Sequence, residues 1–139
     1  MGTHVHTHHV TDGFTYQNHP DHRNNSAGKS QWTISEGDEL SVFDLARTNS
    51  WLLAKCGWGL FMPNGTVSYL GLDQRHERPL FVAKFVAANQ SILWHGYPAD
   101  HERHIQDRPS TEILRNWMDS ELLPEAKIRK IGRGQPCSL

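Results

Sequence analysis

Residues 51–72, with the sequence WLLAKCGWGLFMPNGTVSYLGL, give the clearest indication of the fold. Two apolar runs flank Pro63, Asn64 and Gly65, and an Asn-Gly pair accepts the positive φ angles of the turns that match strand twist. The stretch therefore predicts a β-hairpin. In its first arm Gly57 and Gly59 would share one face, which indicates a bulge or a close approach of neighbouring backbone.

The residues that follow the hairpin suggest a helix and then a strand. Residues 79–89 are apolar around every face, which fits a buried helix or a buried strand. Three alanines, a proline in the first turn and Asn89 as an exit favour the helix. Residues 91–97 have the pattern of a strand, and Pro98 stops it.

The last third of the chain predicts two helices. Pro109 fits a first turn, and Pro124 ends that helix and opens a second one, which Gly132 would terminate. The apolar residues of the first helix form one stripe: Ile113, Leu114, Trp117, Met118 and Leu122. The expected fold is α+β, with a small antiparallel sheet (hairpin 51–72 plus strand 91–97), a covering helix near 79–89 and a C-terminal helical hairpin at 109–132.

The amino-terminal segment is poor in apolar side chains. Residues 1–31 cannot offset their ordering entropy alone, so we expect a flexible, histidine-rich tail followed by a single globular α+β domain at 32–139. Phe14 and Tyr16 are an exception, because their spacing would let a short strand dock one aromatic face on the domain. At the very start, Gly2-Thr3-His4 is a sequence that wraps Cu(II) or Ni(II) once the methionine is removed.

Length and composition exclude several classes of protein. The chain has 139 residues, two cysteines and a net charge of -1, which fits one domain without a disulfide scaffold. No apolar run approaches the roughly 18 residues that span a bilayer, and the start lacks a secretory pattern. We therefore expect a soluble cytoplasmic protein without a membrane partner. No sequence feature identifies a cofactor.

Residues 95–108 are the most suggestive stretch for chemistry, because they combine histidines, acids and arginines between a predicted strand and a predicted helix. His95 or His101 could act as a general base that Asp100 orients. Arg103 or Arg108 could then stabilise a phosphate. Such side chains would suit a small histidine-dependent phosphodiesterase or RNase, although they also suit an ordinary solvated loop.

The same stretch could hold a metal ion. The candidate ligands are His95, His101 and His104, of which the last two would share one face if the segment were helical. Their spacing matches no metalloprotease signature.

The end of the chain is basic, although the whole chain is nearly neutral. Cations that would face outward from the second helix are Lys127, Arg129, Lys130 and Arg133. Such a surface attracts phosphate backbones or an acidic protein patch. The favoured function is therefore a small binding protein that engages nucleic acid or an acidic partner through this helix and the 95–108 loop. The alternatives are the phosphodiesterase or RNase and a protein inhibitor of a partner enzyme.

Overall fold

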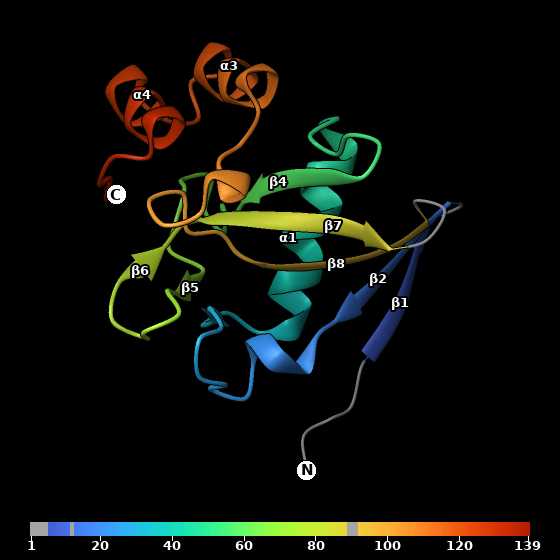
Figure 1. Cartoon of the computed structure of the whole chain (residues 1–139). Coiled ribbons are helices and arrows are strands. Elements are labelled where there is room, and N and C mark those ends of the chain that lie inside the picture. Colours follow the sequence, from blue (N-terminus) through green and yellow to red (C-terminus); the bar gives the residue numbers. More distant parts are fainter. Residues whose placement is uncertain (1–5, 12, 89–91) are drawn as a thin grey trace.

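Five strands form the main sheet in the computed structural model, which describes residues 6–11, 13–88 and 92–139 (Figure 1). In spatial order they are β1 (His6–Thr11), β2 (Phe14–Asn18), β8 (Leu93–Pro98), β7 (Val82–Ala88) and β4 (Cys56–Leu60). β2 and β8 run parallel, and the other neighbouring pairs are antiparallel. The parallel pair joins the amino-terminal hairpin to the rest of the sheet.

A second sheet and several helices complete the α+β fold. The second sheet has three short strands, β3 (Gln31–Trp32), β5 (Gly71–Leu72) and β6 (Pro79–Leu80). The α-helices with described bounds are α1 (Glu36–Thr48), α3 (Thr111–Asp119) and α4 (Glu125–Arg133). Two short 3-10 helices, η1 (Pro20–His22) and η2 (Ile105–Asp107), lie in the connections. The predicted α+β class is confirmed.

Helix α1 covers one face of the main sheet (Figure 1). Its Phe43 is fully buried, with ring centroids 4.7 Å from Tyr16 and 5.3 Å from Phe85. Ser35 caps the helix by accepting a hydrogen bond from the Asp38 amide at 3.0 Å. The sequence analysis missed this helix. The serine cap followed by acids in the first turn was the signal that could have found it.

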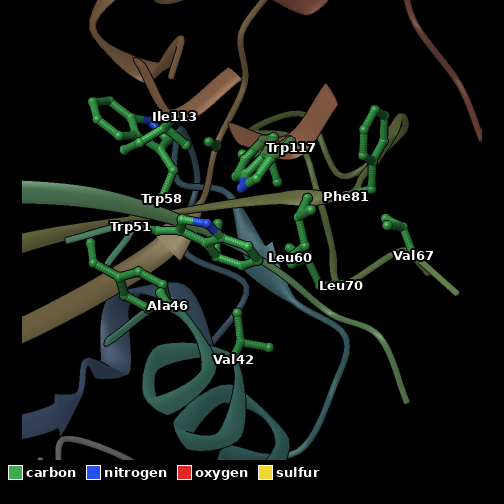
Figure 2. Close-up of a cluster of buried hydrophobic side chains, with 14 of the residues drawn as sticks. Val42, Ala46, Trp51, Trp58, Leu60, Val67, Leu70, Phe81, Ile113 and Trp117 are labelled. Carbon is green, nitrogen blue, oxygen red and sulfur yellow. The ribbon is translucent and has the colours of Figure 1, made fainter. Parts of the chain in front are cut away.

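A second group of core side chains joins α1, β4 and α3 (Figure 2). Trp51 and Trp117 meet edge to face with centroids 5.7 Å apart. The expected close approach at the β4 glycines is confirmed. A Cβ on Gly59 would lie 3.0 Å from the Phe85 ring, and one on Gly57 would lie 2.6 Å from Leu52.

The hairpin predicted at 51–72 is correct for the turn and wrong for the arms. The chain reverses around Gly65 (φ 80°), and Phe61 bridges Ser68, whose amide donates to the Phe61 carbonyl at 2.8 Å. The arms then separate. β4 pairs with β7 in the main sheet, whereas β5 joins the second sheet. Local turn chemistry fixed the reversal, and distant strands supplied better partners for both arms.

The helix predicted near 79–89 is wrong. Residues 79–80 and 82–88 are the strands β6 and β7, while residue 89 lies outside the described ranges. β7 lies between β4 and β8, and residues 82–85 are all buried. An interior strand covered on both faces is apolar all round, and this context overrides the helix propensity of alanine. The strand predicted at 91–97 is confirmed as β8, although it includes Pro98, which was expected to stop it, and residue 91 lies outside the described ranges.

The flexible tail expected over residues 1–31 needs correction. Within the described residues, β1, β2, η1 and β3 lie in this segment, so ordered structure begins well before Trp32. The predicted docking of Phe14 and Tyr16 is confirmed, because Tyr16 is fully buried and Phe14 contacts Phe43 and Trp94. The sheet supplies the apolar partner that the segment lacks by itself. The copper- or nickel-binding motif at Gly2-Thr3-His4 lies outside the described residues.

The predicted helical hairpin at the C-terminus is confirmed as α3 and α4, which pack together near β4 (Figure 1). The terminating glycine is Gly134 (φ 69°) rather than Gly132. None of the helices in the described ranges has both the length and the apolar composition for crossing a bilayer.

Candidate functional site

The face of the main sheet opposite α1 carries polar side chains on β8. Side chains alternate along a strand, so Trp94 and Gly96 face the core while His95 and Tyr97 face the other side. A Cβ on Gly96 would lie 2.4 Å from the Phe85 ring, so the backbone of β8 lies tight against the core. His95 and Tyr97, both half-buried, therefore project from a firmly packed strand.

Two more rings reach this face from the segment that follows β2. His22 stacks on Tyr97 with centroids 5.3 Å apart and planes 18° apart. His19 lies 6.1 Å from His22 and 5.9 Å from His95, measured between ring centroids. Pro20 presets the backbone of η1, which turns the two histidines back over the sheet. We call His19, His22, His95 and Tyr97 the ring cluster.

Hydrogen bonds fix the protonation pattern of two imidazoles. His22 Nδ1 donates to the Ser30 carbonyl at 2.8 Å, which leaves Nε2 with its lone pair. His19 Nδ1 instead accepts from the Asp21 amide at 3.2 Å, so its hydrogen is on Nε2. One ring thus offers a base and its neighbour a hydrogen-bond donor.

Burial lowers the pKa of two histidines in the cluster. For His22, desolvation is the largest effect and lowers the pKa. The hydrogen bond to the Ser30 carbonyl and the charge of Asp21 raise the pKa, whereas His19 and Lys29 lower it further. For His95, desolvation and the nearby His19 both lower the pKa. Both rings are therefore mainly neutral at pH 7 and able to accept a proton.

A polar pocket of about 360 Å³ adjoins the cluster. His22 and Tyr97 form one part of its lining, and Lys29, Gln74 and His104 form others. Lys29 is exposed, and no hydrogen bond or ion pair to its ammonium is recorded within the described ranges. His104 Nε2 donates to Gln74 Oε1 at 3.0 Å. The pocket thus combines a cation, neutral donors and acceptors, and the carboxylates of Asp100 and Asp107.

Asp107 holds the 95–108 loop against the sheet. Its carboxylate accepts from the Tyr97 hydroxyl at 2.8 Å and from the Asp100 amide at 2.9 Å, and its carbonyl accepts from Trp58 Nε1 at 3.0 Å. Burial and the Asp107 charge raise the pKa of Tyr97, so it stays a neutral phenol. The loop is consequently tied to two strands, and Tyr97 presents a fixed ring.

The predicted catalytic residues do not converge. His95 belongs to the ring cluster and Asp100 lines the pocket, but Asp100 is buried and paired with Arg78 at 2.7 Å. His101 is buried and donates to the Gln135 carbonyl at 2.8 Å.

The two predicted phosphate-binding arginines are also apart from the cluster. Arg108 donates to the His101 carbonyl at 3.0 Å, and its guanidinium lies against Gly134 at the end of α4. Arg103 is exposed, and only its backbone amide contacts Asp100. Arg108 therefore joins the loop to the end of α4, and its guanidinium does not face the cluster.

The predicted metal ligands His95, His101 and His104 do not form a site. Across the described part of the chain, no group of three or more histidine, cysteine or acidic side chains is arranged to hold a metal ion. His101 and His104 each use Nε2 in a hydrogen bond to another segment.

Two of the four cations of the predicted basic surface on α4 are engaged within the chain, and one of them is paired with an acid. Lys127 donates to the Ser138 carbonyl at 2.7 Å, and Arg129 pairs with Glu125 at 2.7 Å. Lys130 and Arg133 are exposed near the end of the helix, where cations also complement the helix dipole.

Sequence reasoning missed His19, His22 and Lys29, because it assigned residues 1–31 to a tail. The available signal was His-Pro-Asp-His at 19–22, in which a proline in the first turn and an acid predict a helical turn. That signal could have located η1, although it could not have placed the turn over β8.

Comparisons with known proteins identify no relative. No protein-family model, no curated protein and no solved structure matches the chain.

Proposed function

We propose that the chain binds single-stranded nucleic acid across the ring cluster and the adjoining pocket. The observation that carries the proposal is the contact of four half-buried rings on the sheet face opposite α1, beside a pocket with an exposed lysine. Imidazole and phenol rings stack on nucleobases, and such stacking contributes about 1–3 kcal/mol per base. Lys29 supplies a charge for a phosphate.

The acids near the pocket do not oppose a phosphate strongly. Asp100 is paired with Arg78, and Asp107 accepts hydrogen bonds from Tyr97 and from the backbone of Asp100. These contacts hold both carboxylates in place, and the exposed Lys29 supplies a cation in the same pocket for an approaching anion.

A single strand fits this surface better than a duplex. Base faces are hidden within a duplex, whereas a splayed base can stack on an exposed ring. A pocket of about 360 Å³ has room for one such base next to the stacked pair His22 and Tyr97. The 95–108 loop thus keeps its expected role in binding, and α4 has a smaller one because two of its four cations are already engaged.

We expect Tyr97→Ala to weaken binding of a fluorescent single-stranded DNA octamer roughly 5- to 150-fold, the equivalent of one lost stacked base. Tyr97→Phe keeps the ring and should bind within about threefold of the native chain, because only the hydroxyl contact to Asp107 is lost. Fluorescence anisotropy at fixed salt measures both dissociation constants.

The paired change Arg129→Glu with Lys130→Glu is the matched test of α4. Binding should weaken less in this variant than in Tyr97→Ala. The reverse order, with charge reversal on α4 abolishing binding and Tyr97→Ala leaving it intact, would overturn the proposal and favour the basic helix. An octamer that does not bind the native chain at all would also overturn it.

A further inference from the structure

We propose that the ring cluster also cleaves RNA, by attack of a ribose 2′-hydroxyl on the adjacent phosphodiester. This inference rests on the proposed binding function, and it names RNA as the substrate class and His22 and His95 as the reacting side chains. The hydrogen bonds, the spacing and the burial of three imidazoles support this role.

His22 has the arrangement of a general base. Its Nδ1 hydrogen is committed to the Ser30 carbonyl at 2.8 Å, so any proton it takes up must go to Nε2. Its ring is held parallel to Tyr97, which limits rotation away from the pocket that it lines. A fixed, mainly neutral imidazole beside a ligand pocket is suited to removing a hydroxyl proton.

His95 lies across His19 from His22. His19 is 5.9 Å from His95 and 6.1 Å from His22, between centroids, so the two outer rings both lie next to His19. Phosphoryl displacement needs a base near the attacking oxygen and an acid near the leaving oxygen, each within about 2.6–3.2 Å. A protonated His95 would serve as the acid.

Cleavage exchanges one bond to phosphorus for another and moves two protons. His22 Nε2 takes the proton of the 2′-hydroxyl, the 2′-oxygen forms a bond to phosphorus, and the bond from phosphorus to the 5′-oxygen breaks. The leaving oxygen takes a proton from His95. The products are a 2′,3′-cyclic phosphate and a 5′-hydroxyl, and later attack by water with the two imidazoles in reversed roles restores their protonation.

Two neighbouring groups can stabilise the charge on phosphorus. The ring of His19, which carries its hydrogen on Nε2, lies next to both reacting imidazoles, and Lys29 lines the same pocket as His22. Donors aimed at the non-bridging oxygens stabilise the transition state more than the ground state, because negative charge builds up there.

The test uses the full chain in EDTA and a fluorescent DNA octamer that contains one ribonucleotide. In single-turnover reactions with saturating protein, the native chain should cut only at the ribonucleotide and leave the cyclic phosphate, identified by mass spectrometry. His22→Ala and His95→Ala should each slow the cut by about 10²- to 10⁴-fold. His9→Ala removes an exposed histidine of the same sheet and should retain the native rate.

The outcomes separate the two proposals. If the native chain binds the all-deoxy octamer but does not cut the chimera, the cleavage inference is wrong and the binding function stands. If the native chain binds neither the all-deoxy octamer nor the chimera, both the binding proposal and the cleavage inference are wrong. Equal rates in the native chain and His22→Ala, or cleavage of the all-deoxy octamer, would also overturn the inference.

The pH dependence gives a second readout of the same experiment. The rate requires neutral His22 and protonated His95, and burial lowers both pKa values, with His19 adding to the effect on each. Lys29 lowers and Asp21 raises the pKa of His22 to a smaller extent. At protein concentrations well below saturation the profile reports the pKa values of the free chain, so its bell should have an optimum below about pH 6.5, the ordinary histidine value. An optimum above pH 7.5 would contradict the assignment.

Discussion

Replacing Glu39 with alanine should lower the free energy of unfolding by about 3–5 kcal/mol, the usual effect of removing one partner from a buried ion pair. Glu39 is fully buried, and its carboxylate accepts from the Arg23 guanidinium at 2.7 and 3.1 Å and from the Tyr16 hydroxyl. Its removal leaves the Arg23 charge and the Tyr16 hydroxyl without their acceptor. Urea denaturation, followed by tryptophan fluorescence, measures the loss.

Glu36→Ala is the matched control, because Glu36 lies in the same helical turn and pairs with His6 near the surface. Its effect should stay below about 1 kcal/mol. Equal effects at the two positions would show that the buried pair does not anchor the amino-terminal segment.

Burial raises the pKa of Glu39 despite the bonds from Tyr16 and Arg23, so the pair is retained at a cost in desolvation. Its structural result is that Arg23, one residue after η1, is fixed to α1.

Asp107→Ala should lower the free energy of unfolding by about 2–4 kcal/mol and weaken binding of the DNA octamer at least tenfold. A buried carboxylate that accepts two hydrogen bonds is lost, and the Tyr97 hydroxyl and the Asp100 amide lose their acceptor. Because Asp107 also accepts from the Asp100 amide and so holds the part of the loop that lines the pocket, this variant should lose more binding than Tyr97→Phe, which breaks only the hydroxyl contact. Urea denaturation and anisotropy on the same preparation measure both effects.

Asp119→Ala provides the control for the loss of an aspartate. Asp119 is exposed at the C-terminal end of α3, where removal of a negative charge is neutral or slightly stabilising. Asp119→Ala should therefore change neither the free energy of unfolding nor the affinity for the DNA octamer measurably. A folded Asp107→Ala variant with native affinity would contradict the role of this residue in positioning Tyr97.

How far the sequence predicts this fold depends on where each element finds its partners. The C-terminal helices were predictable because Ile113, Leu114 and Trp117 form an apolar stripe that any packing partner would bury. The strand β7 was not predictable as a strand, because an interior strand and a buried helix share the same apolar pattern. β1 and β2 are stable only through long-range contacts, such as the pairing of Gln17 with His95, that composition does not reveal.

The site was predicted in part for the same reason. The 95–108 loop and His95 were identified from local composition, and both contribute to the cluster or its pocket. His19 and His22 come from a segment more than seventy residues earlier in the chain. Only the parallel register of β2 and β8 brings them over His95 and Tyr97. No spacing rule within either segment encodes that register.

Imidazole NMR of the full chain, with and without the all-deoxy octamer, tests most directly whether the ring cluster contacts nucleic acid. A bound phosphate favours the protonated form, so the pKa values of His22 and His95 should both rise on binding, and their resonances should shift in proportion to occupancy. His9 should be unaffected. Saturation with the octamer that leaves the His22 and His95 resonances unchanged while shifting residues of α4 would contradict the account.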